Sequence, residues 1–232
     1  MQPYFLPYIG YFQLIKCVDL FVVYDDAQWM KGGWINRNKI SVGRNNEAFM
    51  TLPVRSSPLN TLIKDKEFSN PAFAVAKKQI LRRVKSAYCS CPFFEDGFDL
   101  LRQVFEFQSL NTCDFIVNSL NLTCTYLGIR TPFSRSSQCP SLGDLRSVEK
   151  VNQVAKVSGY SHYVNPVGGA KLYDKKYFSS SGIELSFLRP RMQEPASDSS
   201  LKYPPRYLSI LDGIMRQSPS VLSQMLCEYE LV

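Results

Sequence analysis

The sequence predicts an α/β fold: a small, mostly parallel, Rossmann-like sheet with a helical layer contributed by the middle of the chain. Residues 20–24 form a short apolar run rich in β-branched side chains, which is typical of a buried strand. Predicted strands and helices alternate before and after the middle of the chain, as they do in parallel sheets. Residues 73–127 instead carry helical periodicity. We therefore expect a single α/β domain over residues 1–232, with residues 73–127 as a helical insertion or subdomain.

The first elements are expected to form a βαβ unit. A short helix over residues 10–16 precedes the strand at residues 20–24, and a first strand would lie at or before Gln2. The chain enters its first motif directly, so this first strand is expected to be short. Residues 47–54 predict a further strand, which Pro53 ends.

The middle of the chain predicts three helices, because apolar side chains recur there on one face. They are expected over residues 73–88, 97–108 and 113–127. Asn111 or Thr112 would cap the last of them, and Gly128 fits the position just after its end.

The last part of the chain returns to alternating strands and helices. In order, we expect a helix near residues 147–157, a strand at 160–164, a loop at 165–169, a helix near 174–181 and a strand at 183–187. Residues 189–206 hold four prolines and little periodicity, which predicts a long loop. Two short helices are expected to close the chain.

Composition indicates a soluble globular protein. Apolar residues make up 45% and charged residues 20% of the chain, which is ordinary for that class. No apolar run of about eighteen residues and no signal peptide is visible, so we expect no membrane span and a cytoplasmic location. The seven cysteines are an odd, scattered set, and His162 is the only histidine. We therefore expect neither a disulfide framework nor a structural zinc site, and no resident metal or cofactor.

The charge balance favours anionic partners. The net charge is +7 and the pI is near 9.0, which suits a sugar nucleotide or an acidic acyl or aminoacyl carrier. Lys78, Arg82 and Lys85 share one face of the first long helix by their spacing. This face is either an ordinary solvated surface or a landing patch for an acidic partner. Nucleic acid is not expected, because no recognition motif accompanies the charge.

Polar loops follow three of the predicted strands. They cover residues 3–11, 25–38 and 165–174. In open α/β sheets, ligands bind beyond the carboxyl ends of the strands. We therefore expect one shared site, a single cavity bordered by Tyr8, Tyr11, Asp25, Arg37 and Asn165.

The first two loops hold phosphate-binding and acid–base candidates. Tyr8, Gly10 and Tyr11 open a helix, whose free N–H groups suit a phosphate; the alternative is a rigid, aromatic-packed turn. Asp25 and Asp26 are adjacent, so one of them would face the site. That carboxylate would act as a general base or hold Mg²⁺ with a substrate phosphate; the alternative is a turn that ends the strand.

A triplet of Asn36, Arg37 and Asn38 follows. Arg37 suits a phosphate or carboxylate that it binds with two donors, and the two asparagines suit sugar hydroxyls. The alternative is an asparagine-rich turn in which Arg37 forms an ion pair with Asp25 or Asp26.

The third loop suits a backbone that approaches a ligand closely, because it carries Asn165, Gly168 and Gly169, with Tyr173 shortly after. The alternative is a tight turn. His162 precedes the loop and is either a general base or a packing residue.

Several of these segments together resemble a known family. They cover residues 2–12, 24–26, 33–38, 88–94, 163–174, 182–188 and 208–212. In order and in type they resemble the WbqC-like proteins over nearly the whole chain. The resemblance implies a role in bacterial surface-polysaccharide or other amino-sugar pathways.

Three functions are consistent with these features. The first is a transferase that N-acylates or N-aminoacylates a nucleotide-linked amino sugar. The second is a nucleotide-dependent activating enzyme of the nucleotidyltransferase kind. The third is a non-catalytic carbohydrate- or partner-binding protein, because no Ser–His–Asp or Cys–His set is visible.

Overall fold

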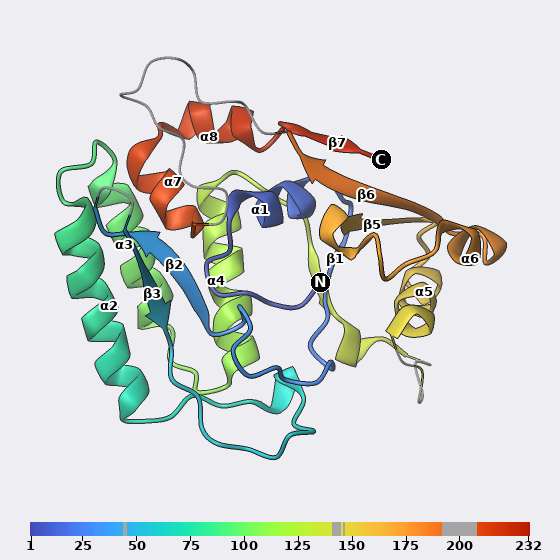
Figure 1. The fold of residues 1–232 in the computed structure, drawn as a ribbon, viewed down its shortest axis with the longest axis horizontal. Coiled ribbons are helices and arrows are strands. Elements are labelled where there is room, and N and C mark those ends of the chain that lie inside the picture. Colours follow the sequence, from blue (N-terminus) through green and yellow to red (C-terminus); the bar gives the residue numbers. More distant parts are fainter. Residues whose placement is uncertain (44–45, 141–144, 146, 192–207) are drawn as a thin grey trace.

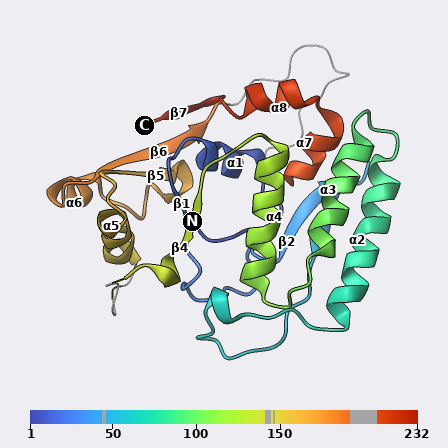
Figure 2. The ribbon, with the colours of Figure 1, turned by 180° about the vertical axis from the view of Figure 1, so that it is seen from behind.

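The computed structural model describes residues 1–43, 46–140, 145, 147–191 and 208–232. Figure 1 shows three regions along its longest axis: long helices on one side, the N-terminal segments in the middle, and a small α/β unit on the other side. Figure 2 shows the same order from behind. The small unit comprises α5 (Ser147–Val157), β5 (His162–Pro166), α6 (Lys175–Ser180) and β6 (Glu184–Pro190).

The predicted helical layer is confirmed. It consists of α2 (Ala72–Tyr88), α3 (Phe94–Glu106) and α4 (Thr112–Tyr126). Asn111 caps α4, since its side chain accepts a hydrogen bond from the Asp114 amide at 3.0 Å. Gly128 follows with φ +69°, the left-handed conformation that favours glycine. The two predicted closing helices are α7 (Ile210–Arg216) and α8 (Pro219–Met225).

Close packing joins the helical layer to the end of the chain. A Cβ atom on Gly97 of α3 would lie 2.6 Å from the Met215 side chain of α7. Only glycine therefore lets the two helices approach this closely.

Lys78, Arg82 and Lys85 of α2 are all exposed, as the spacing of the sequence predicts. Among the described helices, none combines the length and hydropathy needed to cross a bilayer.

The strands form small separate sheets. β1 (Phe21–Val23) pairs in parallel with β4 (Phe133–Arg135), and β5 pairs in parallel with β6, which pairs antiparallel with β7 (Tyr229–Leu231). β2 (Arg37–Ser41) and β3 (Glu47–Thr51) form an antiparallel hairpin. A mixed α/β fold is confirmed, but a single Rossmann-like sheet is not: in the described chain, the two parallel pairs are separate.

Some boundaries differ from the prediction. The predicted helix at residues 10–16 is α1 (Ile9–Lys16). β2, β4 and β7 were not expected, because they are short or polar. The predicted loop at residues 165–169 is wrong in part: Asn165 and Pro166 belong to β5, and a 3₁₀ turn, η3 (Val167–Gly169), follows. The predicted loop at residues 189–206 lies mostly outside the described residues.

The predicted first strand is reduced to a single paired residue. The Met1 amino group donates to the Val22 carbonyl at 2.7 Å, and the Tyr24 amide donates to the Met1 carbonyl at 2.8 Å. This is the hydrogen-bond pattern of a parallel pair between Met1 and Val23. No strand is assigned between residues 1 and 8.

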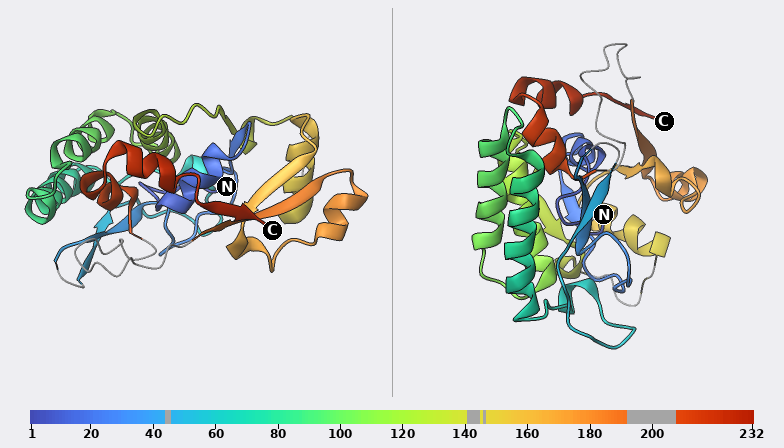
Figure 3. Two further views of the ribbon diagram at one scale, coloured as in Figure 1. Left: turned by 90° about the horizontal axis from the view of Figure 1, so that it is seen from above. Right: turned by 60° about the vertical axis from the view of Figure 1, so that its left-hand side comes forward.

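Buried apolar side chains form two clusters in the described chain. The larger one joins the N-terminal segments to the helical layer and α7, with Phe5, Phe12 and Phe115 fully buried. The smaller one lies between α5, α6 and the β5–β6 pair, around Phe178. The top view in Figure 3 shows the two parts on either side of the N-terminus.

A buried polar network ties the hairpin, α2 and α7 together. The Tyr88 hydroxyl donates to Asp212 Oδ1 at 2.7 Å and accepts from the Ser41 amide at 3.0 Å. Arg216 Nε also donates to Asp212 Oδ1, at 3.0 Å. Burial and the neighbouring Asp212 carboxylate raise the pKa of Tyr88, so its hydroxyl stays protonated and donates.

Replacing Tyr88 with phenylalanine should lower the free energy of unfolding by about 1–3 kcal/mol, because a buried carboxylate and a backbone amide each lose a partner. Tyr126→Phe is the matched control: its buried hydroxyl has no hydrogen-bond partner within the described chain. Urea unfolding of both variants measures the difference. Equal losses would show that the Tyr88 network contributes nothing beyond packing.

Candidate functional site

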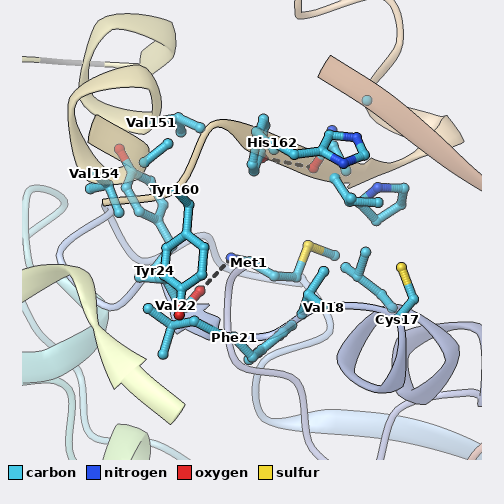
Figure 4. A pocket seen from close by; sticks show the side chains of 18 of the residues that line it. Met1, Cys17, Val18, Phe21, Val22, Tyr24, Val151, Val154, Tyr160 and His162 are labelled. Carbon is cyan, nitrogen blue, oxygen red and sulfur yellow. Dashed lines mark hydrogen bonds between the residues drawn. The ribbon is translucent and has the colours of Figure 1, made fainter. Parts of the chain in front are cut away.

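A cavity of about 630 Å³ lies between the N-terminal segments and the small α/β unit. Its volume is within the usual range for small-molecule sites. Figure 4 shows it around Met1, between β1 and the end of α1 on one side and α5 and β5 on the other. Most of its wall is apolar, from α1 and the segment after it, β1 and α5: Leu14, Val18, Phe21, Val22, Val151, Val154 and Ala155.

We refer to the cavity lining at the carboxyl ends of β1 and β5 as its polar end. It is lined by residues at or just beyond the carboxyl ends of β1 and β5: Tyr24, Asn165, Gly168, Gly169 and Tyr173. Asn165 is only 8% exposed, and its Oδ1 accepts from the Tyr163 hydroxyl at 3.1 Å. A Cβ atom on Gly169 would lie 2.0 Å from Asn165 Nδ2. Gly169 therefore makes room for the Asn165 side chain.

Tyrosines dominate this end. The Tyr163 ring packs edge to face with Tyr173 at a centroid distance of 5.9 Å and stacks with Phe178 at 5.6 Å. Burial, with a smaller contribution from Tyr173, raises the pKa of Tyr163 well above its usual value. Burial and the Asp26 carboxylate raise the pKa of Tyr24 to about 12. At neutral pH these phenols therefore donate hydrogen bonds and do not act as bases.

Beside Tyr24, two carboxylates meet the end of β4. The fully buried Asp25 accepts from the Ser137 amide at 3.0 Å and the Ser137 hydroxyl at 2.8 Å. The Ser136 hydroxyl lies 2.6 Å from Asp26 Oδ1 and 3.2 Å from Asp25 Oδ1. The parallel pairing of β1 with β4 brings these residues together over 110 positions of sequence.

A lysine completes this cluster. Lys150 of α5 forms a 2.5 Å ion pair with Asp26, and both side chains are 12% exposed. The Lys150 ammonium also lies over the Tyr24 ring, 5.7 Å from its centroid. Tyr24 therefore lines the cavity and also contacts the Lys150 ammonium that pairs with Asp26.

Five of the predicted site residues line the cavity: His162, Asn165, Gly168, Gly169 and Tyr173. His162 is exposed, and its Nε2 lies 2.9 Å from the Ser186 hydroxyl. Asp25 and Asp26 do not line the cavity but follow Tyr24, which does.

The first motif lies elsewhere. Neither Tyr8, Gly10 nor Tyr11 lines the cavity. Tyr11 is buried and its hydroxyl donates to the Gln2 carbonyl at 2.7 Å. A Cβ atom on Gly10 would lie 2.3 Å from the Tyr8 ring. The described geometry is that of a rigid, aromatic-packed turn, and Tyr8, Tyr11 and Arg37 do not border the cavity that Asn165 lines.

The side chains of residues 36–38 donate hydrogen bonds to backbone carbonyls of neighbouring segments. Asn36 Nδ2 donates to the Leu52 carbonyl at 2.7 Å, and Asn38 Nδ2 donates to the Leu6 carbonyl at 2.7 Å. Arg37 donates to the carbonyls of Gly32 and Gly33 and lies over the Phe49 ring. Among the described residues Arg37 donates to backbone carbonyls and forms no ion pair with Asp25 or Asp26; Asp25 accepts from Ser137, and Asp26 pairs with Lys150.

Sequence reasoning missed Ser136, Ser137, Lys150 and Tyr163. Ser136 and Ser137 lie in a 3₁₀ turn, η2 (Ser136–Gln138), directly after β4, whose three residues carry too little pattern to predict a strand. Lys150 looks like any polar residue of an amphipathic helix. The signal that would have found them is the pairing of β1 with β4, which one sequence does not reveal.

Gly169→Ala should displace the Asn165 side chain and lower the free energy of unfolding by about 1–3 kcal/mol, because the new methyl group overlaps Asn165. Gly168→Ala is the matched control, since a Cβ atom there meets nothing within 4 Å. Thermal unfolding of both variants checks this. A Gly168 variant as unstable as the Gly169 variant would contradict the packing argument.

Comparison with known proteins identifies a family over most of the sequence. The model of the WbqC-like protein family matches residues 2–224. An uncharacterized protein of Mycobacterium tuberculosis, Rv1507c, is 27% identical over 189 residues, which cover 81% of this chain and 79% of that protein. No solved structure matches. Because the family model spans nearly all of the sequence, the chain belongs to the WbqC-like protein family.

Proposed function

We propose that this protein is a transferase of bacterial surface-polysaccharide or amino-sugar biosynthesis that N-acylates or N-aminoacylates a nucleotide-linked amino sugar. The observation that carries the proposal is the contact of Tyr24 with two sets of groups. One is the tyrosine- and asparagine-lined end of the cavity; the other is the Asp26–Lys150 pair. Membership of the WbqC-like family supports the proposed class of pathway. A cytoplasmic location is part of the same proposal.

The polar end of the cavity has the groups that a sugar needs. Tyr24 and Tyr173 offer aromatic faces for the apolar side of a sugar ring, and phenol groups for its hydroxyls. Asn165 offers an amide whose Nδ2 group donates. The net charge of +7 favours the negative charge of the nucleotide part.

Asp26 and Lys150 are the proposed acid–base pair. The sugar amine attacks the acyl carbonyl carbon, so a C–N bond forms and the bond to the donor's leaving group breaks. Because Asp26 does not itself line the cavity, the proton that the nitrogen loses passes through a solvent molecule to the Asp26 carboxylate and then to the leaving group. Lys150 balances the charge of Asp26 and holds its carboxylate in place. The acyl or aminoacyl donor is a carrier-bound or otherwise activated acid.

Asp26→Asn should lower the rate of acyl transfer by about 10²–10⁴-fold with little change in substrate affinity, because it removes the proposed base but keeps the shape. Tyr173→Ala should instead weaken sugar-nucleotide binding. Asp99→Asn is a matched control, since Asp99 pairs with Arg102 on the surface. Calorimetric titration with uridine- and thymidine-diphosphate amino sugars, combined with product analysis, measures both effects.

The same titration distinguishes the other two functions. Nucleotide binding that requires magnesium and ignores the sugar would favour an activating enzyme. No binding of any sugar nucleotide would favour a non-catalytic protein. Either result would overturn the transferase proposal, as would full activity in Asp26→Asn.

The exposed basic face of α2 fits an acidic acyl or aminoacyl carrier as a partner. Lys78, Arg82 and Lys85 lie on this helix, on the side of the molecule opposite to α5 and α6 (Figures 1 and 2). A carrier bound there would reach the cavity only through a long flexible arm. A carrier therefore has two alternative docking faces, the basic face of α2 and the surface beside the cavity.

Reversing charge with Lys78→Glu and Arg82→Glu should weaken binding of an acidic carrier protein about tenfold at low salt and less at high salt, because exposed charges are screened. The matched control reverses Lys156 and Lys176, which are exposed on α5 and α6 beside the cavity. Binding is measured by fluorescence anisotropy at several salt concentrations. If only the Lys156 and Lys176 variant lost binding, the carrier would dock beside the cavity and not on α2.

A further inference from the structure

The outer face of the β2–β3 hairpin carries aromatic and basic side chains. Side chains alternate between the two faces of a strand, so Met50 is buried against the core while Arg37, Lys39 and Phe49 lie on the opposite face. Phe49 is 40% exposed, and Trp34, shortly before β2, is also 40% exposed. Large side chains exposed together in this way are typical of a binding surface.

Trp34, Arg37 and Phe49 contact one another, and we call these three side chains the aromatic platform. The ring centroids of Trp34 and Phe49 are 6.2 Å apart. The guanidinium carbon of Arg37 lies 4.9 Å from the Phe49 centroid and 6.0 Å from the Trp34 centroid. Arg37 Nε also donates to the Gly33 carbonyl at 3.1 Å, which fixes the guanidinium in place. The platform is therefore formed before any ligand binds, which lowers the entropy cost of binding.

Positive charge surrounds the platform. The Lys39 ammonium lies 5.3 Å from the Phe49 centroid, and Arg83 of α2 donates to the Phe49 carbonyl at 2.8 Å. Arg83 is exposed, and neither it nor Arg37 forms an ion pair within the described residues. Glu47 pairs with Lys39 at 2.7 Å and offsets that charge alone. The surface therefore carries positive charge that favours an anionic ligand.

This surface lies apart from the cavity. Figures 1 and 2 show β2 and β3 beside α2, on the side of the molecule away from α5 and α6. The contact between Arg83 and Phe49 joins residues 34 positions apart in the sequence. No linear recognition motif is therefore visible, although the folded chain places rings and cations together.

Flat rings beside unpaired cations match a single strand of nucleic acid. Its bases stack on aromatic side chains whatever their identity, and its phosphates bind arginine and lysine. The bases of a duplex are already stacked on one another and cannot reach the rings. An acidic protein would bind the cations but would not need the rings. The single strand is thus the ligand that uses both parts of the surface.

We propose that the aromatic platform, together with Lys39 and Arg83, binds single-stranded nucleic acid. One base stacks on Trp34 and another on Phe49, while Lys39 and Arg83 contact the phosphates between and beside them. Arg37 holds the two rings in position. Because no residue of this surface lines the cavity, the proposal does not depend on the proposed transferase function.

The first test measures binding of a fluorescein-labelled uridine oligonucleotide of about twelve nucleotides by anisotropy at low salt. Trp34→Ala and Phe49→Ala should each weaken binding about 5- to 150-fold, because each removes one stacked base. Tyr177→Ala is the matched control, since this tyrosine of α6 is also exposed and lies outside the platform. No binding by the unaltered protein, or equal binding by all three variants, would overturn the proposal.

A fluorescence measurement keeps the test decisive if an alanine variant fails to fold. The chain has two tryptophans, Trp29 and Trp34, and a base stacked on an indole quenches its emission. The oligonucleotide should therefore quench the unaltered protein. Trp34→Phe keeps a ring for stacking, so it should bind within about threefold of the unaltered protein but lose the quenching. Quenching that persists in Trp34→Phe would place the strand near Trp29 and contradict the proposal.

The contribution of the phosphates is measured by the salt dependence of binding. Arg83→Gln should weaken binding and reduce the slope of log affinity against log salt by about one, because one phosphate contact is lost. Lys176→Gln is the matched control, since it removes the same charge from an exposed position of α6. Equal slopes for the two variants would show that only the net charge matters, which would also contradict the proposal.

Competition separates the classes of ligand. Duplex RNA of the same length and polyglutamate both carry negative charge, but neither offers free bases to the rings. Each should displace the labelled oligonucleotide only at concentrations at least about tenfold above those of unlabelled single strand, because the stacking contribution is missing. Displacement by polyglutamate or duplex at the concentration of the single strand would show a surface that binds charge alone, and would overturn the proposal.

Discussion

The structure depends on how the buried backbone of residues 2–8 satisfies its hydrogen bonds, because this segment is neither strand nor helix. Leu6 is the one described non-glycine residue with a positive φ, +42°. Its carbonyl accepts from Asn38 Nδ2 at 2.7 Å and from the Ser209 hydroxyl at 2.8 Å. These bonds join the N-terminal segment to the hairpin and to the start of α7. They also hold the chain that leads from Met1 beside β1 to α1, and so one wall of the cavity.

Sequence reasoning succeeded where the structure depends on residues close together in the sequence. Long amphipathic helices such as α2 and α4 could be predicted, since their periodicity and the cap at Asn111 are local properties. Asn165, Gly168 and Gly169 could be predicted to line a cavity, because a glycine-rich turn after a strand is also a local pattern.

The remainder could not be predicted, because it depends on pairings distant in the sequence. Arg37 and Asn38 carry groups that bind ligands in many proteins, yet here they bind carbonyls of Gly33 and Leu6. Ser136 and Lys150 join Asp26 only because β4 pairs with β1 and α5 lies beside them. A polar side chain in such a motif can bind either a ligand or buried backbone groups, and only the fold shows which of the two it binds.

The cavity between the two apolar clusters has a mechanical consequence. The cavity of about 630 Å³ lies where a single continuous core would otherwise run, so the two clusters pack separately. The close-packed clusters around Phe115 and Phe178 offer little to compress. The junction between α1 and α5 is therefore packed less densely than either cluster, so a force that separates the two parts meets its least resistance where the polar groups lie.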